Sequence, residues 1–369
     1  MAAEKKRLQY VDMIKGIAIL WIVCYHLIAP NGPKNLIINH LMDAMLVSFF
    51  FFSGYFYRPG KRSIGESIWN RTKSLMAPFF KYSLLFWAVG SVYLVATQEE
   101  TIKEAFLCLR NFFAGCIWNR VIQDWFGWEY YSLGKRYFFL ADFWFLIALL
   151  FASILFFLIA DLALKSKAGS IITAAALFAV TGICLHFGVV LPYNLQLIPY
   201  WTAFLLLGAF FGQNRLLELE SLSRGARWGA GICLLAAGIV VSIVKEPSPN
   251  QFRGSFGENE VMSMLLCIVT AILIIWGAGI VCVLTETAGV RVKELAWLGS
   301  HSLLIYLYHM FFAWIICAIT GFSVRYEDPS PAGVIAKSLI LTLMCLGLGI
   351  LINILSDFLA SKFKSEKSA

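Results

Sequence analysis

The amino-acid sequence predicts an all-α fold: a polytopic integral membrane helical bundle of about ten transmembrane helices. Of its 369 residues, 60% are hydrophobic and only 14% are charged, whereas soluble proteins carry about a quarter charged residues. Apolar segments of membrane-spanning length recur along the chain. The net charge of +8 is spread over short connections, which indicates membrane topology rather than a nucleic-acid partner.

Ten segments are apolar and long enough to span, or nearly span, a bilayer. In chain order they are residues 13–29, 41–57, 75–95, 138–161, 171–190, 195–211, 229–244, 261–284, 303–319 and 334–358. No soluble domain, tandem repeat or low-complexity linker separates them, so residues 1–369 are expected to form a single membrane domain. An even number of spans places both termini on the same side.

Basic residues indicate which side that is. The termini and the connections after the second, fourth, sixth and eighth spans hold 19 of the 30 lysines and arginines, and the other connections hold nine. Short cytoplasmic loops are enriched in Lys and Arg. We therefore expect a multi-pass plasma-membrane protein with both termini in the cytoplasm.

The longest outer connection, residues 96–137, is expected to carry an amphipathic helix. Its apolar residues recur at helical spacing, namely Ile102, Ala105, Phe106, Leu109, Phe112, Phe113, Cys116 and Ile117. This pattern indicates a helix that lies on or dips into the outer leaflet. The remainder sets aromatic residues beside charged ones such as Asp124 and Glu129, which suits carbohydrate binding and an ordinary aromatic belt equally.

Lys15 and His26 lie on one face of the first span. They are eleven residues apart, and at about 100° per residue their directions differ by about 20°. At 1.5 Å per residue they are about 16 Å apart along the helix axis, and Asp12 lies within side-chain reach of Lys15. An ionisable residue inside a membrane is a functional candidate, although an isolated histidine more often hydrogen-bonds across the bundle.

A second basic cluster lies on the same side. Arg71 and Lys73 stand at the start of the third span, and Lys81 lies farther in. Such cations favour an anionic ligand with phosphates, and His26 marks where its reactive end would reach. Coenzyme A, a polyphosphate head with a thin arm ending in a thioester, has this shape. Other anions fit too, and topology alone explains most of the basic residues.

Five segments resemble motifs of membrane acyltransferase family 3. They are Asp12–His26, with a lysine eleven positions before the histidine, Ser48–Phe56, Asn70–Phe79, Phe143–Leu146 and Trp297–His309. They follow one another from residue 12 to residue 309, and the sugar O-acetylase-like branch is the most similar. The family often has two arginines in the third-span motif, whereas here Ser74 stands at the spacing of the second.

The resemblance implies an O-acyltransferase that moves an acyl group, usually acetyl, from cytoplasmic acetyl-CoA or another acyl-CoA to a hydroxyl of a cell-surface or secreted glycan. His26 would be the essential catalytic residue, assisted by Lys15, and Lys15, Arg71 and Lys73 would bind the donor. An imidazole can remove the proton of a sugar hydroxyl as it attacks a thioester. An acyl-histidine relay is the alternative. No permanently bound cofactor is implied.

Supporting residues are less clearly marked. Ser302, Tyr306 and His309 share one face of the ninth span, where a polar packing stripe is favoured over direct catalysis. Glu129 could orient a base or bind sugar hydroxyls, but a solvated outer loop fits equally well. The nine cysteines show no CxxC or Cys/His metal spacing, so no metal site is expected.

Two other functions fit the sequence. A transporter or flippase for a glycan or lipid-linked sugar suits ten spans with a polar interior, although no internal hydropathy repeat is visible. A non-catalytic membrane scaffold of a polysaccharide assembly machine would not need the pair of Lys15 and His26. The acceptor, the acyl chain and the oligomeric state do not follow from the sequence.

Overall fold

The computed structural model describes residues 8–28, 37–118, 137–244, 251, 254–290, 292–320, 336, 340–351 and 354–355, without the side chains of residues 28, 114–118, 138, 141, 142 and 320. This part of the chain is built from helices and contains no β-strand. Nine of its helices are long and apolar enough to cross a membrane. The predicted all-α, multi-span membrane bundle is confirmed.

The nine long helices are α1 (Gln9–Ile28), α2 (Ile37–Tyr55), α3 (Ile64–Ala96), α6 (Trp144–Ala163), α7 (Lys167–His186), α8 (Ile198–Asn214), α9 (Arg224–Val244), α10 (Glu260–Thr287) and α12 (Ser302–Thr320). Short 3₁₀ turns precede two of them, η2 (Phe138–Phe143) before α6 and η3 (Pro192–Leu197) before α8. A short helix, α11 (Lys293–Ser300), precedes α12. The tenth expected span is described only in part, as an apolar helix over Ile340–Leu351.

Helix α3 begins eleven residues earlier than expected, at Ile64 rather than residue 75. Ser63 caps it, because its hydroxyl accepts a hydrogen bond from the Glu66 N–H at 3.2 Å. The helix has 33 residues and is therefore about 50 Å long, more than the roughly 30 Å core of a bilayer. Arg71 and Lys73 consequently lie within the helix, not at its start.

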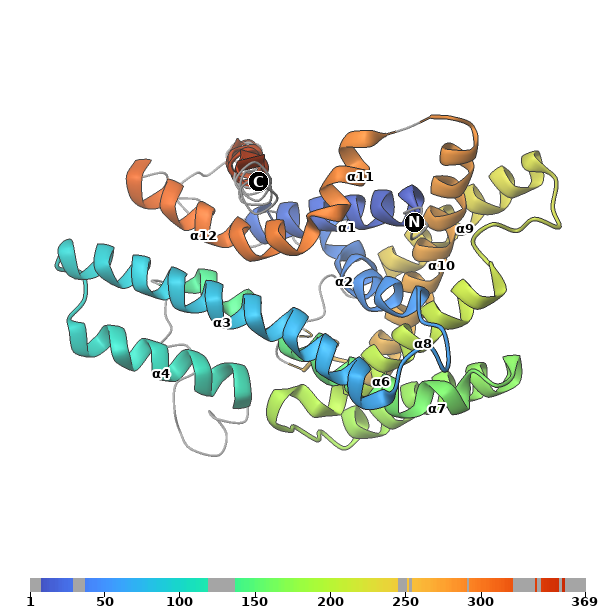
Figure 1. Cartoon of the computed structure of the whole chain (residues 1–369), viewed down its shortest axis with the longest axis horizontal. Helices are drawn as coiled ribbons and strands as arrows, with labels where there is room; N and C mark the ends of the chain where they lie inside the picture. Colours follow the sequence, from blue (N-terminus) through green and yellow to red (C-terminus); the bar gives the residue numbers. More distant parts are fainter. Residues whose placement is uncertain are drawn as a thin grey trace, which may run out of the picture.

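The amphipathic helix expected within residues 96–137 is confirmed as α4 (Ile102–Trp118), and its position at the outer leaflet stays a prediction. A reciprocal cap starts it: the Glu104 carboxylate accepts from the Thr101 N–H at 2.7 Å, and the Thr101 hydroxyl accepts from the Glu104 N–H at 3.3 Å. Helix α4 lies beside α3 (Figure 1), where the Trp87 indole donates to the Ala105 carbonyl at 2.9 Å. One apolar face of α4 therefore packs against α3.

Helices α2 and α8 lie innermost in the bundle. The rings of Phe50 and Trp201, both fully buried, stack between them with centroids 5.6 Å apart. Gly208 and Gly212 lie one turn apart on α8, so near α2 backbone carbonyls that an added Cβ would collide. In contrast, α7 and α9 expose large apolar side chains, as helices that face lipid do.

The ends of the spans meet on two sides of the bundle. The Tyr10 hydroxyl, at the start of α1, lies 3.0 Å from that of Tyr55 at the end of α2, and the Tyr10 N–H donates to Glu286 at the end of α10 at 2.9 Å. On the opposite side, the Tyr93 hydroxyl of α3 donates to the Ala318 carbonyl of α12 at 3.3 Å. Successive spans therefore alternate in direction, and we call the first of these sides the N-terminal side.

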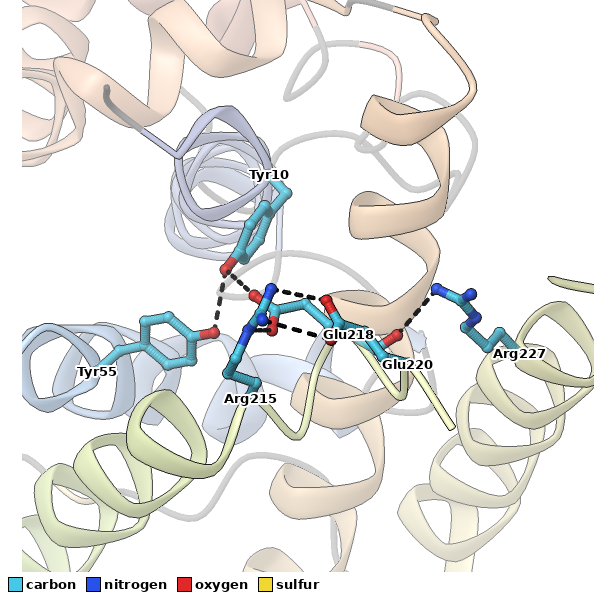
Figure 2. Close-up of polar contacts among 6 residues, drawn as sticks. All are labelled: Tyr10, Tyr55, Arg215, Glu218, Glu220 and Arg227. Atoms are coloured by element: carbon cyan, nitrogen blue, oxygen red, sulfur yellow. Dashed lines mark hydrogen bonds and ion pairs between the residues drawn. The ribbon is translucent and has the colours of Figure 1, made fainter. Parts of the chain in front are cut away.

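A polar clamp of Tyr10, Tyr55, Arg215, Glu218 and Glu220 lies on the N-terminal side (Figure 2). Arg215 pairs with Glu218 at 2.5 Å and with Glu220 at 2.7 Å, and the Tyr10 hydroxyl donates to Glu218 at 3.4 Å. The hydrogen bond and charge of Glu218 raise the pKa of Arg215. The clamp joins α1 and α2 to the connection that follows α8.

A buried polar cluster joins three helices away from the clamp. The Asp43 carboxylate of α2 is 2% exposed and accepts a hydrogen bond from the Gln251 side chain at 3.0 Å. The Gln251 amide oxygen in turn accepts from the Trp201 indole of α8 at 2.9 Å, and Cys267 of α10 lies 3.5 Å from Asp43. These hydrogen bonds satisfy buried polar groups, for which neither lipid nor apolar side chains offer a partner.

Hydrogen bonds join the two ends of the connection over residues 96–137. The Tyr137 hydroxyl donates to the buried Glu100 carboxylate at 2.5 Å and lies 2.8 Å from the Ser91 hydroxyl. Burial, and then the hydrogen bond to Glu100, raise the pKa of Tyr137, which keeps the phenol as the donor. Residues 119–136, with Asp124 and Glu129, lie outside the described residues.

Candidate active site

Two histidines from distant parts of the chain meet inside the bundle. His26 on α1 and His309 on α12 are 283 residues apart, and His26 Nδ1 lies 2.8 Å from His309 Nε2. Their rings are nearly parallel, with centroids 5.1 Å apart and planes at 15°. His309 Nδ1 lies 2.6 Å from the Tyr306 carbonyl oxygen. The polar stripe expected on the ninth span therefore contacts the residue expected to be catalytic.

A cavity of about 380 Å³, which we call the inner cavity, runs along α1. Asp12, Lys15, Arg71, Ser302 and Tyr306, five of the residues singled out from the sequence, line it. Its walls are otherwise mostly apolar and include Ile22, Phe49 and Phe145. Since Ile22 is one turn before His26, and Tyr306 about one turn before His309, the cavity reaches the neighbourhood of the histidine pair.

A second cavity of about 350 Å³, the basic vestibule, adjoins the first. Arg58, Lys61 and Arg62 from the α2–α3 connection line it together with Arg71, and no carboxylate belongs to its described lining. Both cavities share Arg71 and Phe56. Each has the volume of a small-molecule site, and together they form one site with a basic opening and an apolar interior.

Arg71 stands where the two cavities meet, held by two serines. Its Nε donates to the Ser153 hydroxyl of α6 at 3.1 Å, and its Nη2 donates to the Ser53 hydroxyl of α2 at 3.0 Å. Among the residues that the structure describes, no carboxylate pairs with this half-buried guanidinium. Three helices therefore fix a cation whose charge is not offset by a neighbour, which favours an anion as ligand.

The backbone around Lys15 is set by a crossing of α1 and α11. At Gly16, a Cβ would collide with the Leu295 carbonyl, and at Gly299 a Cβ would collide with the Asp12 carbonyl. Only glycine lets the two helices approach so closely. The crossing fixes the part of α1 that carries Asp12 and Lys15 on the wall of the inner cavity.

A family profile described as an acyltransferase domain matches residues 8–358 of the chain. The chain belongs to membrane acyltransferase family 3. The match covers every residue of the two cavities and the histidine pair. Comparison with curated proteins and with solved structures finds no match.

The family motifs noted in the sequence meet at this site. Asp12, Lys15 and His26 come from the first motif, Arg71 from the third, and His309 from the last. Four expected residues do not belong to the described linings of the cavities: His26 and His309, which lie about one turn beyond Ile22 and Tyr306, and Lys73 and Glu129. Lys73 is exposed, with its ammonium 4.8 Å from the centre of the Trp69 ring, and it lines neither cavity. Glu129 lies outside the described residues.

Sequence reasoning missed three residues of this acyltransferase site. Ser53 and Ser153 orient Arg71, and Tyr57 lines the vestibule with its hydroxyl donating to Asp161 at 2.6 Å. Burial and the bond to Asp161 raise the pKa of Tyr57. Ser53 lies within the second family motif, which was a usable signal. Ser153 lies in an otherwise apolar segment, so no signal in the sequence marked it.

Proposed function

We propose that this membrane acyltransferase moves an acetyl group from cytoplasmic acetyl-CoA to a hydroxyl of a cell-surface or secreted glycan. It would lie in the plasma membrane with both termini in the cytoplasm. One observation carries the proposal: the basic vestibule and the inner cavity share Arg71 and Phe56. A basic opening thus leads into an apolar passage whose lining includes Ile22 and Tyr306, close to the histidine pair.

The two-part site suits the two parts of CoA. The vestibule offers Arg58, Lys61 and Arg62 to the phosphates as charge-assisted donors. Arg71, at the junction, would contact the pyrophosphate, since its planar guanidinium suits phosphate oxygens. The pantetheine arm would extend through the inner cavity past Lys15, and its thioester would reach the end near Tyr306.

The lining beside Tyr306 favours a short acyl group. The ring of Phe145 lies 5.2 Å from that of Tyr306 and 6.2 Å from that of Phe49. These three rings form an aromatic wall in a cavity of only about 380 Å³. A pantetheine arm with an acetyl group would use most of this space, whereas a long acyl chain would meet the wall.

His26 supplies the proposed chemistry. As the acceptor oxygen attacks the thioester carbonyl carbon, His26 takes the hydroxyl proton, the C–S bond breaks, and the leaving thiolate recovers that proton. In a relay, a His26 nitrogen instead attacks the thioester carbonyl carbon, the C–S bond breaks, and CoA leaves as the thiolate. The cationic acetyl-histidine then gives its acetyl group to the acceptor hydroxyl, and the proton that the hydroxyl loses balances the thiolate. An acetyl group trapped on His26 in incubations with donor alone would identify the relay.

The acceptor and the orientation have separate support. The glycan acceptor is proposed from the resemblance to the sugar O-acetylase-like branch. The orientation is proposed because 19 of the 30 basic residues fall on the side of the termini. The vestibule belongs to that side, since its connection follows Tyr55 of the polar clamp, and acetyl-CoA is made in the cytoplasm.

The test is acetyl transfer by the purified full-length protein, measured as release of the CoA thiol and as acetyl ester on a glycan acceptor. We expect His26→Ala to lower the rate by about 10²–10⁴-fold while acetyl-CoA binding is retained. His186→Ala is the matched control, because this exposed histidine ends α7 and lines neither cavity. Near-normal transfer by a folded His26→Ala protein would reject the mechanism and favour a transporter.

A further inference from the structure

The histidine pair belongs to a hydrogen-bonded chain of three groups: the Tyr306 carbonyl, His309 and His26. The Tyr306 carbonyl lies against His309 Nδ1 at 2.6 Å, and His309 Nε2 lies against His26 Nδ1 at 2.8 Å. His309 is 1% exposed and lines neither cavity. His309 thus contacts the catalytic candidate from a fully buried position, whereas His26 is only half-buried.

The end of this chain fixes the position of every proton along it. A carbonyl oxygen only accepts hydrogen bonds, so His309 Nδ1 carries a hydrogen and donates it to Tyr306. With both rings neutral, His309 Nε2 then has no hydrogen and accepts. His26 Nδ1 must be the donor to it, which leaves His26 Nε2 unprotonated, as a general base requires.

We propose that His309 is a positioning residue that selects the tautomer and ring orientation of His26, so that Nε2 of His26 is the nitrogen that reacts. This role rests on the proposed function. When Nε2 takes a proton or an acyl group, His26 becomes cationic. Its Nδ1–H then donates more strongly to His309 Nε2, which stabilises that charge inside the bundle. A histidine partner thus does here what a carboxylate does for other catalytic histidines.

A packing role for His309 predicts a different response to substitution at this position. If His309 only fills space in a polar stripe with Ser302 and Tyr306, any polar side chain of similar size at position 309 should serve equally. If it positions His26, only a side chain with an acceptor where Nε2 stands should serve. Glutamine places its amide near the Nε2 position. Asparagine places its amide near the Nδ1 position, where it can bond Tyr306 but cannot reach His26.

The experiment compares His309→Gln with His309→Asn in the full-length protein, measuring kcat and the KM for acetyl-CoA separately. We expect kcat within about tenfold of wild type for His309→Gln and about 10²-fold lower for His309→Asn. The KM should stay unchanged in both, because His309 lines neither cavity. An equal kcat in the two variants, high or low, would overturn the positioning role.

A second measurement holds even if a His309 variant fails to fold. Nitrogen NMR of wild-type protein labelled with ¹⁵N-histidine reports the tautomer of each of the five histidines, and the His26 signals are those missing from His26→Ala. We expect His26 protonated at Nδ1 and not at Nε2, and the opposite tautomer would overturn the proposal. If His26→Ala keeps its activity, the proposed function fails. If it is inactive while both His309 variants behave alike, only the positioning role fails.

Discussion

At the scale of single residues, Arg71 is the most informative side chain outside the histidine pair. It lies on a helix long enough to cross the membrane, and it hydrogen-bonds to Ser53 and Ser153. Within the described residues no carboxylate offsets its charge. A cation held in this way is costly without a partner, and the cost is recovered when an anion binds. The two serine hydroxyls are uncharged, so they orient the Arg71 guanidinium without neutralising it.

Arg71→Ala should therefore weaken acetyl-CoA binding. Loss of a charge-assisted hydrogen bond costs about 1.5–3 kcal/mol, which corresponds to roughly 10- to 10²-fold in Kd. Titration calorimetry on the purified protein measures this directly. Lys165→Ala is the control, since this exposed lysine in the α6–α7 connection lines neither cavity.

Lys73→Ala decides between two interpretations of the third-span motif. The resemblance makes Lys73 a donor ligand, whereas the structure turns it toward Trp69. We expect a change in Kd smaller than that of Arg71→Ala by about tenfold or more. Equal losses in the two variants would show that Lys73 turns into the vestibule when the donor binds.

At the scale of helices, α1 is the element on which the site depends, because it carries Asp12, Lys15 and His26. The polar clamp holds its first turn through Tyr10. The crossing with α11 holds the following turns through Gly16. The contact with α12 holds its far end through His26. Displacing α1 at Tyr10 or at Gly16 should disturb the site without touching a reacting group.

Gly16→Ala tests the crossing. The added Cβ would collide with the Leu295 carbonyl, and forcing a close contact apart costs about 1–3 kcal/mol. We expect a lower melting temperature and a lower kcat, because the neighbouring Lys15 shifts with the backbone. Gly229→Ala on α9 is the matched control: its Cβ meets nothing within 4 Å. That change should leave kcat unaltered and hold or raise the melting temperature, since Ala favours helix.

At the scale of the whole molecule, the bundle has two ends, the N-terminal side and the side opposite to it. The vestibule and the clamp lie on the N-terminal side, and α4 lies beside α3 (Figure 1). In the proposed function, the donor therefore enters from the N-terminal side and the acceptor from the opposite side. This separation suits an enzyme that takes its donor from the cytoplasm and modifies a glycan outside it.

The orientation is tested by labelling single cysteines in a background without the nine native ones. Gln98→Cys follows α3, and Ser221→Cys lies in the α8–α9 connection near the clamp. Because the basic residues gather on the side of Ser221, we expect an impermeant reagent on intact cells to label position 98 only. Labelling of both positions from outside would reject the proposed topology.

The sequence by itself determined the class of the protein and the course of its spans. Apolar length and charge in short connections are local properties, and they act directly on membrane insertion. The spacing of Lys15 and His26 and the amphipathic pattern of α4 are also local properties of the sequence. The early start of α3 was also encoded locally, in the cap formed by Ser63 and Glu66, and was overlooked because the polar residues that follow it do not resemble a span.

Only the tertiary structure decided which residues share the site. The contact between His26 and His309 joins positions 283 residues apart, and Arg71 is held by serines from two other helices. Such pairings depend on which helix faces meet and how closely. Glycines such as Gly16 and Gly299 set that distance by letting backbones touch. Hydrophobic periodicity finds the buried face of a helix but not its partner, so the histidine pair and the joined cavities emerged only when the helices were packed.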